Sequence, residues 1–127
     1  MKIKLTSVMV DDQNKALKFY TETLGFAVSK DIPMGEARWL TVVSPEGPDD
    51  IELLLEPMGF PPAKTYQKAL FEAGIPATAF AVENIQNDYE RMKKLGVLFR
   101  SEPTKMGPVT VAVFEDTCGN LIQMVME

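Results

Sequence analysis

The amino-acid sequence predicts an α+β fold made of two related halves, each with the order strand, helix, strand, strand, strand. Runs of β-branched and apolar residues bounded by turn residues indicate the strands. Apolar residues spaced by three and four before a glycine indicate one amphipathic helix in each half. Short patterns also recur: Gln-Asn at 13–14 returns at 86–87, and Leu-Gly at 24–25 returns at 95–96. Two copies indicate a pseudo-symmetric domain rather than an array of repeats.

The first half begins with a strand over Ile3–Val10, after which Asp11-Asp12 offers a helix cap. The spacing of apolar residues predicts a helix over Asp12–Leu24, which Gly25 ends. Turn signals rich in Pro and Gly then separate three further strands. These strands are expected over Phe26–Lys30, Ala37–Val43 and Ile51–Glu56.

A connector of about residues 58–75 follows, in which Met58–Ala63 is rich in Pro and Gly and Thr65–Ala73 is a short helix ended by Gly74. The second half then repeats the first. Its elements are expected to be a strand over Ala77–Val82, a helix over Asn84–Leu95, and strands over Val97–Ser101, Val109–Glu115 and Leu121–Met126. We therefore expect one domain over 1–127, with one module over about 1–57 and the other over about 76–127.

Composition excludes several classes of partner. The formal net charge is -5 with scattered Lys and Arg, so we expect no nucleic-acid binding. No apolar run is long enough for a membrane span or resembles a signal peptide, and we expect a cytoplasmic protein without membrane contact. The single cysteine, Cys118, allows no internal disulfide and fits a reducing compartment. It lies in the turn 116–120, and without any histidine to act as its base we do not expect a catalytic cysteine.

Four motifs carry a resemblance to a known family: Val-x-Asp at 10–12, Ala-Leu-x-Phe-Tyr at 16–20, Leu-Gly-Phe at 24–26 and Phe-Glu-Asp-Thr-Cys-Gly-Asn-Leu at 114–121. Together they resemble the vicinal oxygen chelate superfamily, which includes glyoxalase I, bleomycin-resistance proteins, fosfomycin-resistance enzymes and extradiol dioxygenases. The commoner family form of the late turn is Asp-Pro-Asp-Gly-Asn, so Thr117-Cys118 departs from it. The resemblance implies two βαβββ modules forming a cupped mixed sheet, the glyoxalase/bleomycin resistance-like fold, and often a homodimer.

The resemblance also implies where metal ligands would lie. In metal-binding members one ligand comes from the first strand and one from the last strand of each module. The corresponding residues here are Leu5, Glu52, Ala77 and Gln123. Leu5 and Ala77 have no donor atom, and the chain has no histidine. We therefore expect neither a bound metal nor another cofactor.

Two curved sheets side by side are expected to enclose a groove where a ligand binds. Strand alternation decides which side chains line it. Arg38 and Trp39 face opposite ways, so one of them should reach the groove. The lining is mostly apolar and suits an uncharged or cationic small organic molecule. The expected ligand-binding residues are Leu5, Ser7, Met9, Trp39, Glu52, Leu54, Ala77, Ala79 and Gln123.

Three functions fit this groove. The first is a metal-free protein that binds a small organic molecule in the manner of bleomycin-resistance proteins. The second is an enzyme, a glyoxalase-like lyase or isomerase or a dioxygenase-like protein, in which Glu52 is a metal ligand or the catalytic acid or base. Enclosure would raise the pKa of Glu52 by desolvation and suit it to proton transfer. The third is a dimeric scaffold whose groove has collapsed.

Overall fold

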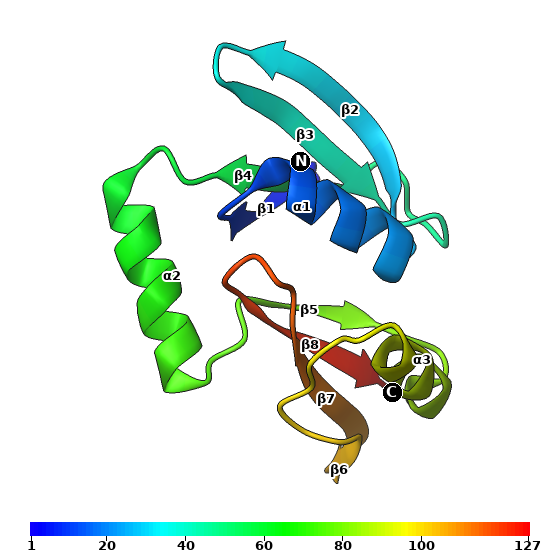
Figure 1. Ribbon diagram of the computed structural model, residues 1–127. Helices are drawn as coiled ribbons and strands as arrows, with labels where there is room; N and C mark the ends of the chain where they lie inside the picture. Colours follow the sequence, from blue (N-terminus) through cyan, green and yellow to red (C-terminus); the bar gives the residue numbers. More distant parts are fainter. The chain divides into compact units, whose positions relative to one another are not determined.

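The computed structural model describes residues 1–127 and divides into two compact units, Met1–Lys64 and Thr65–Glu127. Each unit contains one four-stranded mixed sheet and follows the βαβββ order (Figure 1). The α+β class and the repeated βαβββ order are thus confirmed. The boundary between the units falls inside helix α2 (Pro61–Ala73).

The first sheet has the strand order β1-β4-β3-β2. Its strands are β1 (Leu5–Val10), β2 (Ala27–Met34), β3 (Ala37–Val43) and β4 (Glu52–Pro57). Although β4 is the last of these four strands in the sequence, it lies inside the sheet, between β1 and β3. It runs parallel to β1, from the pair Leu5↔Glu52 to the pair Val10↔Pro57, and antiparallel to β3.

One helix covers one face of this sheet. Helix α1 (Gln13–Lys18) continues directly into a π-helical segment, η1 (Phe19–Thr23), so the expected helix is present but widens in its second half. The Asp12 side chain caps it by accepting a hydrogen bond from the Lys15 backbone N–H at 3.1 Å. Packing of the helix onto the sheet buries apolar side chains from both, which supplies the main stabilisation of this half. They include Val8, Val10, Ala16, Phe19, Tyr20, Leu40, Val42 and Leu55.

Strands β3 and β4 pair over a short stretch only, at Thr41↔Leu54 and Val42↔Leu53. Further along, the side chain of Gln13 bridges them. Its Nε2 donates to the carbonyl oxygens of Arg38 at 2.8 Å and Leu55 at 2.9 Å. The amide of α1 therefore replaces ladder hydrogen bonds where the two strands separate.

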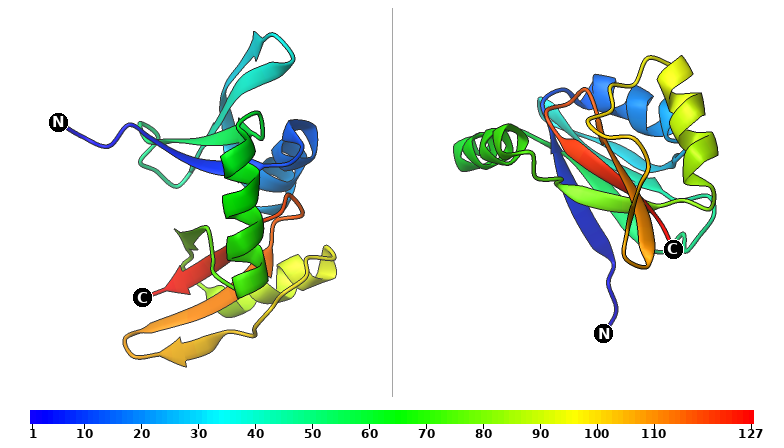
Figure 2. Two further views of the ribbon diagram at one scale, coloured as in Figure 1. Left: turned by 90° about the vertical axis from the view of Figure 1, so that its left-hand side faces the viewer. Right: turned by 90° about the horizontal axis from the view of Figure 1, so that it is seen from below.

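Strands β2 and β3 form a long hairpin, visible in the left view of Figure 2. Every residue of β2 is exposed, since β2 is an edge strand. The pairing shifts between Val28↔Val42 and Lys30↔Thr41, which leaves Ser29 as an extra residue. Such a β-bulge moves the side chains that follow it to the opposite face of the strand.

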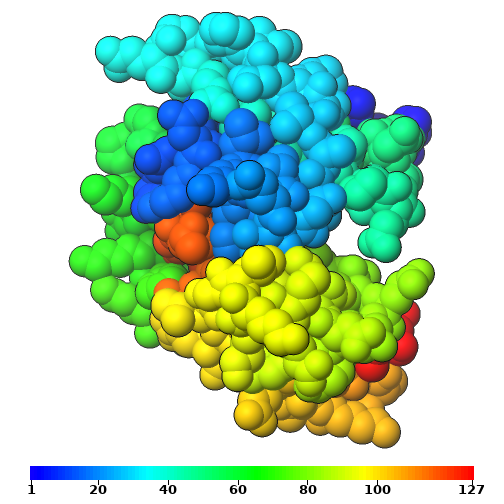
Figure 3. Space-filling view, turned by 45° about the vertical axis from the view of Figure 1, so that its right-hand side comes forward, coloured from blue at the N-terminus to red at the C-terminus, as the bar shows by residue number.

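The second sheet repeats the arrangement with the order β5-β8-β7-β6. Its strands are β5 (Thr78–Ala81), β6 (Thr104–Met106), β7 (Val109–Glu115) and β8 (Leu121–Met126). Helix α3 (Ile85–Lys94), capped by Asn84, packs against β7 and β8. Its charged residues Glu90, Arg91, Lys93 and Lys94 are exposed. The helix forms part of the yellow surface in Figure 3. None of the helices combines the length and apolar composition that crossing a lipid bilayer requires.

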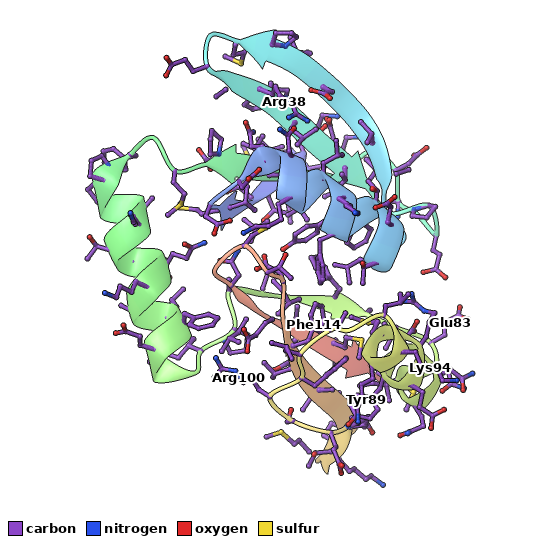
Figure 4. The ribbon with its side chains drawn as sticks, in the orientation of Figure 1. Arg38, Glu83, Tyr89, Lys94, Arg100 and Phe114 are labelled. Atoms are coloured by element: carbon purple, nitrogen blue, oxygen red, sulfur yellow. The ribbon has the colours of Figure 1, made fainter.

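An aromatic cluster fills the space beneath α3. The ring centroids of Tyr89 and Phe99 are 4.7 Å apart in an edge-to-face arrangement, and those of Phe99 and Phe114 are 5.7 Å apart. Tyr89 and Phe114 are labelled in Figure 4. The strand expected over Val97–Ser101 is wrong: this segment forms only an isolated bridge, Phe99↔Phe114. Pro103 follows shortly after and has no N–H for a ladder.

Helix α2 starts at Pro61 rather than at the expected Thr65. Prolines are tolerated in a first helical turn because the N–H groups there have no partner within the helix. Further along α2, the ring of Phe71 lies 4.9 Å from the guanidinium of Arg100. Arg100, labelled in Figure 4, also pairs with Glu115. These contacts hold α2 to the second unit.

The expected turn over residues 116–120 is present and is held by its own side chains. Asp116 Oδ1 accepts from the backbone N–H groups of Cys118 at 2.8 Å and Asn120 at 3.0 Å. Gln67 of α2 donates to the Cys118 carbonyl oxygen and to Asn120 Oδ1, both at 3.1 Å. Thr117 has a positive φ of 67°, so the departure from the commoner family turn changes the backbone, because proline cannot adopt that angle.

Candidate ligand-binding site

Each sheet has a far face, which we define as the face turned away from its helix. In the first sheet, strand alternation and register place all six expected residues of this half on the far face. Glu52 is opposite Leu5 and Leu54 is opposite Ser7 on the parallel pair β1–β4, and Thr41 continues the row on β3. The six are Leu5, Ser7, Met9, Trp39, Glu52 and Leu54.

Glu52 is the centre of a charged cluster on this face. Its Oε1 accepts from Lys30 Nζ at 2.7 Å and from the Thr41 hydroxyl at 2.7 Å, and its Oε2 pairs with Lys4 Nζ at 3.0 Å. Only 4% of Glu52 is exposed. A buried carboxylate needs such partners, because an unpaired buried charge is strongly unfavourable.

These partners lower the pKa of Glu52 from 4.5 to about 2. The largest cause is the hydrogen bond from Lys30, followed by those from Thr41 and Lys4, and together they outweigh desolvation. The sequence-based expectation that enclosure raises this pKa is therefore wrong in direction. Glu52 is an ionised and weakly basic carboxylate at neutral pH.

Thr41 and the β2 bulge determine the position of Lys30. Without the extra residue Ser29, the register would place Lys30 opposite Leu40, whose side chain lies on the helix-covered face. With the bulge, Lys30 lies opposite Thr41 instead, and its backbone N–H donates to the Thr41 hydroxyl at 3.1 Å. The bulge thus brings the ammonium of Lys30 to Glu52.

Sequence reasoning missed both Lys4 and Lys30. Lys4 precedes β1, and Lys30 comes from the edge strand β2, so neither is near Glu52 in the sequence. The available signal was a lone carboxylate in the apolar run 51–55, which required a cationic partner from a neighbouring strand. The sequence did not indicate the bulge that selects Lys30.

Arg38 and Trp39 take opposite faces of β3, as expected. Arg38 lies on the helix side, where it pairs with Asp31 at 3.0 Å and donates to Asn14 of α1 (Figure 4). Trp39 therefore lies on the far face, opposite Ile32 and diagonal to Lys30 in the β2–β3 register. Diagonal neighbours on a sheet are about 7–8 Å apart, within reach of large side chains.

The second sheet places the other expected residues on its own far face. Ala79 pairs with Gln123 across β5–β8, and the backbone N–H of Ala77 donates to the Leu121 carbonyl oxygen at 2.8 Å. Alternation puts Val113, opposite Gln123 on β7, on the same face. This face has small and aliphatic residues around Gln123. The same alternation places Glu115, opposite Leu121, on it, where Glu115 pairs with Arg100 at 3.0 Å instead of forming a three-membered ionic cluster like that of the first sheet.

The residues at the implied metal positions do not fit a metal. Leu5 and Ala77 are hydrocarbons, and both oxygens of Glu52 are already bound by donors, two of them ammonium groups. The structure contains no group of three or more His, Cys, Asp or Glu side chains arranged to hold a metal ion. The carboxylate of Glu52, which the family pattern assigns to metal binding, instead forms ion pairs with the ammonium groups of Lys4 and Lys30.

Comparison with known proteins agrees with the observed fold. Residues 2–124 match the model of the Glyoxalase/Bleomycin resistance protein/Dioxygenase superfamily. The chain is 59% identical to the uncharacterized protein YurT of Bacillus subtilis (strain 168), over 100% of both chains. It is similar to the crystal structure of UcmS2, with 35% identity, a TM-score of 0.83, and coverage of 98% of this chain and 97% of that one. It is also similar to TnmS3, an antibiotic binding protein from Streptomyces sp. CB03234, with 28% identity, a TM-score of 0.79, and coverage of 99% and 95%.

Proposed function

Because the chain belongs to the Glyoxalase/Bleomycin resistance protein/Dioxygenase superfamily, we propose that it binds a small, largely apolar organic molecule on the far faces of its sheets without a metal. The pairing of Glu52 with Lys4 and Lys30 carries this proposal. It neutralises the one carboxylate at the implied metal positions, where Leu5 and Ala77 supply no donor.

The composition of the far faces supports a binding role. Leu5, Met9 and Trp39 offer exposed or half-buried apolar surface in the first sheet, and Ala79 is opposite Gln123 in the second. Apolar surface with a few placed polar groups is typical of small-molecule sites. The similarity to TnmS3, which is an antibiotic binding protein, points the same way.

The enzymatic alternative with Glu52 as acid or base has less support. Efficient general acid–base catalysis needs a pKa near the working pH, whereas the pKa of Glu52 is about 2. If a turnover is found, a Glu52→Gln variant tests this role directly. Unchanged turnover in that variant would exclude Glu52 as the proton-transfer group.

A thermal-shift screen against metabolites and antibiotics, run with and without EDTA, tests the proposed function. A ligand that binds the folded chain raises Tm by mass action, and we expect the same shift with the chelator present. Trp39→Ala should reduce the shift, whereas Phe60→Ala, an aromatic residue 68% exposed, should leave it unchanged. One tightly held metal per chain, found by elemental analysis after purification without added metal, would contradict the metal-free proposal.

We also propose that the chain acts as a cytoplasmic homodimer with one family domain over residues 1–127. Family analogy supports the dimer, and the lone thiol of Cys118 fits a reducing compartment. Sedimentation equilibrium of the purified protein gives its mass directly. A monomer at micromolar concentration would contradict this part of the proposal.

A further inference from the structure

We propose that Lys4 and Lys30 recognise a single anionic oxygen group, a carboxylate or a phenolate, on an otherwise aromatic ligand. This inference rests on the proposed function, since it names the chemical class of the molecule bound there. It begins from the composition of the cluster, which sets two ammoniums against one carboxylate.

The cluster has one positive charge in excess. Each ammonium has three N–H donors and directs one of them at Glu52, so further donors remain on both. The side chains of Lys4 and Lys30 are 62% and 44% exposed, whereas that of Glu52 is 5% exposed. An incoming group therefore meets cationic donors first, and the carboxylate lies beneath them.

The acidic side chains before and after Glu52 in the sequence do not cancel this charge. Asp50, two residues earlier, pairs with Lys2 at 2.8 Å, and Glu56 is too distant. Glu56 lies four residues beyond Glu52 on β4, opposite Met9 of β1. At about 3.3 Å per residue this separation is roughly 13 Å, longer than the screening length of about 8 Å at physiological ionic strength. The two ammoniums also disfavour the cationic ligand that the sequence suggested.

The cluster is held in place before any ligand arrives. The Thr41 hydroxyl, fully buried, accepts from the Lys30 backbone and donates to Glu52, which in turn holds both ammoniums. A preorganised pair of donors loses less conformational entropy on binding than two free lysines would lose. The cluster thus has the geometry of a recognition site as well as its charge.

The surroundings of the cluster favour an aromatic body on the same ligand. Trp39 of β3 is diagonal to Lys30 of β2. Leu54 of β4 is paired with Thr41 on the other side of β3. An indole offers stacking surface to a flat ring, and stacked aromatic pairs are stabilising beyond their buried area. A planar molecule against Trp39 would bring an acidic substituent within reach of Lys30.

Matched probe pairs test the charge requirement, using the full chain and isothermal titration calorimetry. The pairs are 2-naphthoate with 2-naphthamide, and 4-nitrophenolate with 4-nitroanisole, in buffer alkaline enough to ionise the phenol. We expect the anion of at least one pair to bind about tenfold more tightly than its neutral partner, and added salt to reduce this preference. The pair that shows the preference distinguishes a carboxylate from a phenolate ligand.

Variants that change one charge test whether Lys30 causes the preference for the anionic probe. Lys30→Gln should bring the anion-to-neutral ratio close to one, Lys30→Arg should retain it, and Lys18→Gln on the exposed side of α1 should leave it unchanged. Glu52→Gln retains both ammoniums and should retain the preference for the anion. Circular dichroism and urea unfolding confirm that each variant is folded before its affinities are compared.

The outcomes separate this inference from the proposed function. Equal binding of anion and neutral partner by the wild-type chain, or an anion preference unchanged in Lys30→Gln, would overturn the inference and leave the binding role intact. Failure of all four probes, while uncharged library compounds raise Tm, would also overturn it. If neither these probes nor any library compound binds, the proposed function fails as well.

Discussion

The side chain of Gln13 and the backbone of Arg38 exchange two hydrogen bonds, in the way that two paired strand residues do. Gln13 Nε2 donates to the Arg38 carbonyl oxygen at 2.8 Å, and the Arg38 N–H donates to Gln13 Oε1 at 3.0 Å. The residue at the repeated position, Gln86, instead donates to Glu90 of its own helix at 3.1 Å and is exposed. The two halves therefore share a sequence pattern but use it differently.

Gln13→Ala should lower the free energy of unfolding by about 2 kcal/mol, because it leaves three partly buried backbone groups of β3 and β4 without their partner. Gln86→Ala is the matched control and should change stability by less than about 0.5 kcal/mol. Urea unfolding followed by circular dichroism measures both. Equal losses in the two variants would mean that the bridge between the strands does not stabilise the sheet.

Glu52 should make stability depend on pH in acid. Its pKa is lower in the folded chain than its ordinary value, so the unfolded chain binds the proton more readily and stability rises with pH through this window. The contribution is complete above about pH 4.5 and is lost as the pH falls toward about 2. The stability difference between wild type and Glu52→Gln, measured across this range, should therefore shrink on acidification. A difference that is constant from neutral pH to pH 2 would contradict the ion-paired state.

Gly119→Ala should destabilise the chain more than Gly25→Ala does. Both glycines have positive φ, 96° and 86°, so alanine is strained at either site and about 1 kcal/mol or more is lost. At Gly119 the new Cβ would also lie 2.7 Å from Gln67 Oε1, whereas at Gly25 it meets nothing within 4 Å. Thermal unfolding should show the larger loss at Gly119. Adding Gln67→Ala to Gly119→Ala should recover part of it, and the absence of any recovery would contradict the crowding.

Thr117→Gly should raise the free energy of unfolding by up to about 1 kcal/mol, since a β-branched residue is strained at a φ of 67° and glycine is not. Thr117→Pro, which restores the commoner family turn, should be strongly destabilising here because proline fixes φ near -65°. Thr110→Gly, within β7, is the control and should lower stability. A loss in Thr117→Gly equal to that in Thr110→Gly would show that the turn is unstrained.

Much of the fold could be predicted from local pattern. The strands over Ala37–Val43, Val109–Glu115 and Leu121–Met126 match the structure residue for residue, because each combines β-branched residues with clear turn signals. The π-helical widening of η1 and the start of α2 at Pro61 were not predictable in the same way. Both depend on the hydrogen bonds and contacts at the end of a helix, which the spacing of apolar residues does not determine.

The candidate site was predicted less completely. Alternation placed Glu52 and Trp39 on a common face, because the side-chain period of a strand is fixed. The partners of Glu52 depended instead on tertiary structure, since the register shift at Ser29 decides which face Lys30 takes. A pattern along one strand carries no information on a bulge in the neighbouring strand.

The central places of β4 and β8 make each half intolerant of truncation. A chain that stopped before Glu52 would contain the β2–β3 hairpin, but its first strand would have no neighbour to pair with. Loss of residues 121–127 would likewise leave β5 without a neighbour and remove one side of β7. A frameshift within β8 should therefore be as damaging to folding as one within β4, although far more of the chain precedes it.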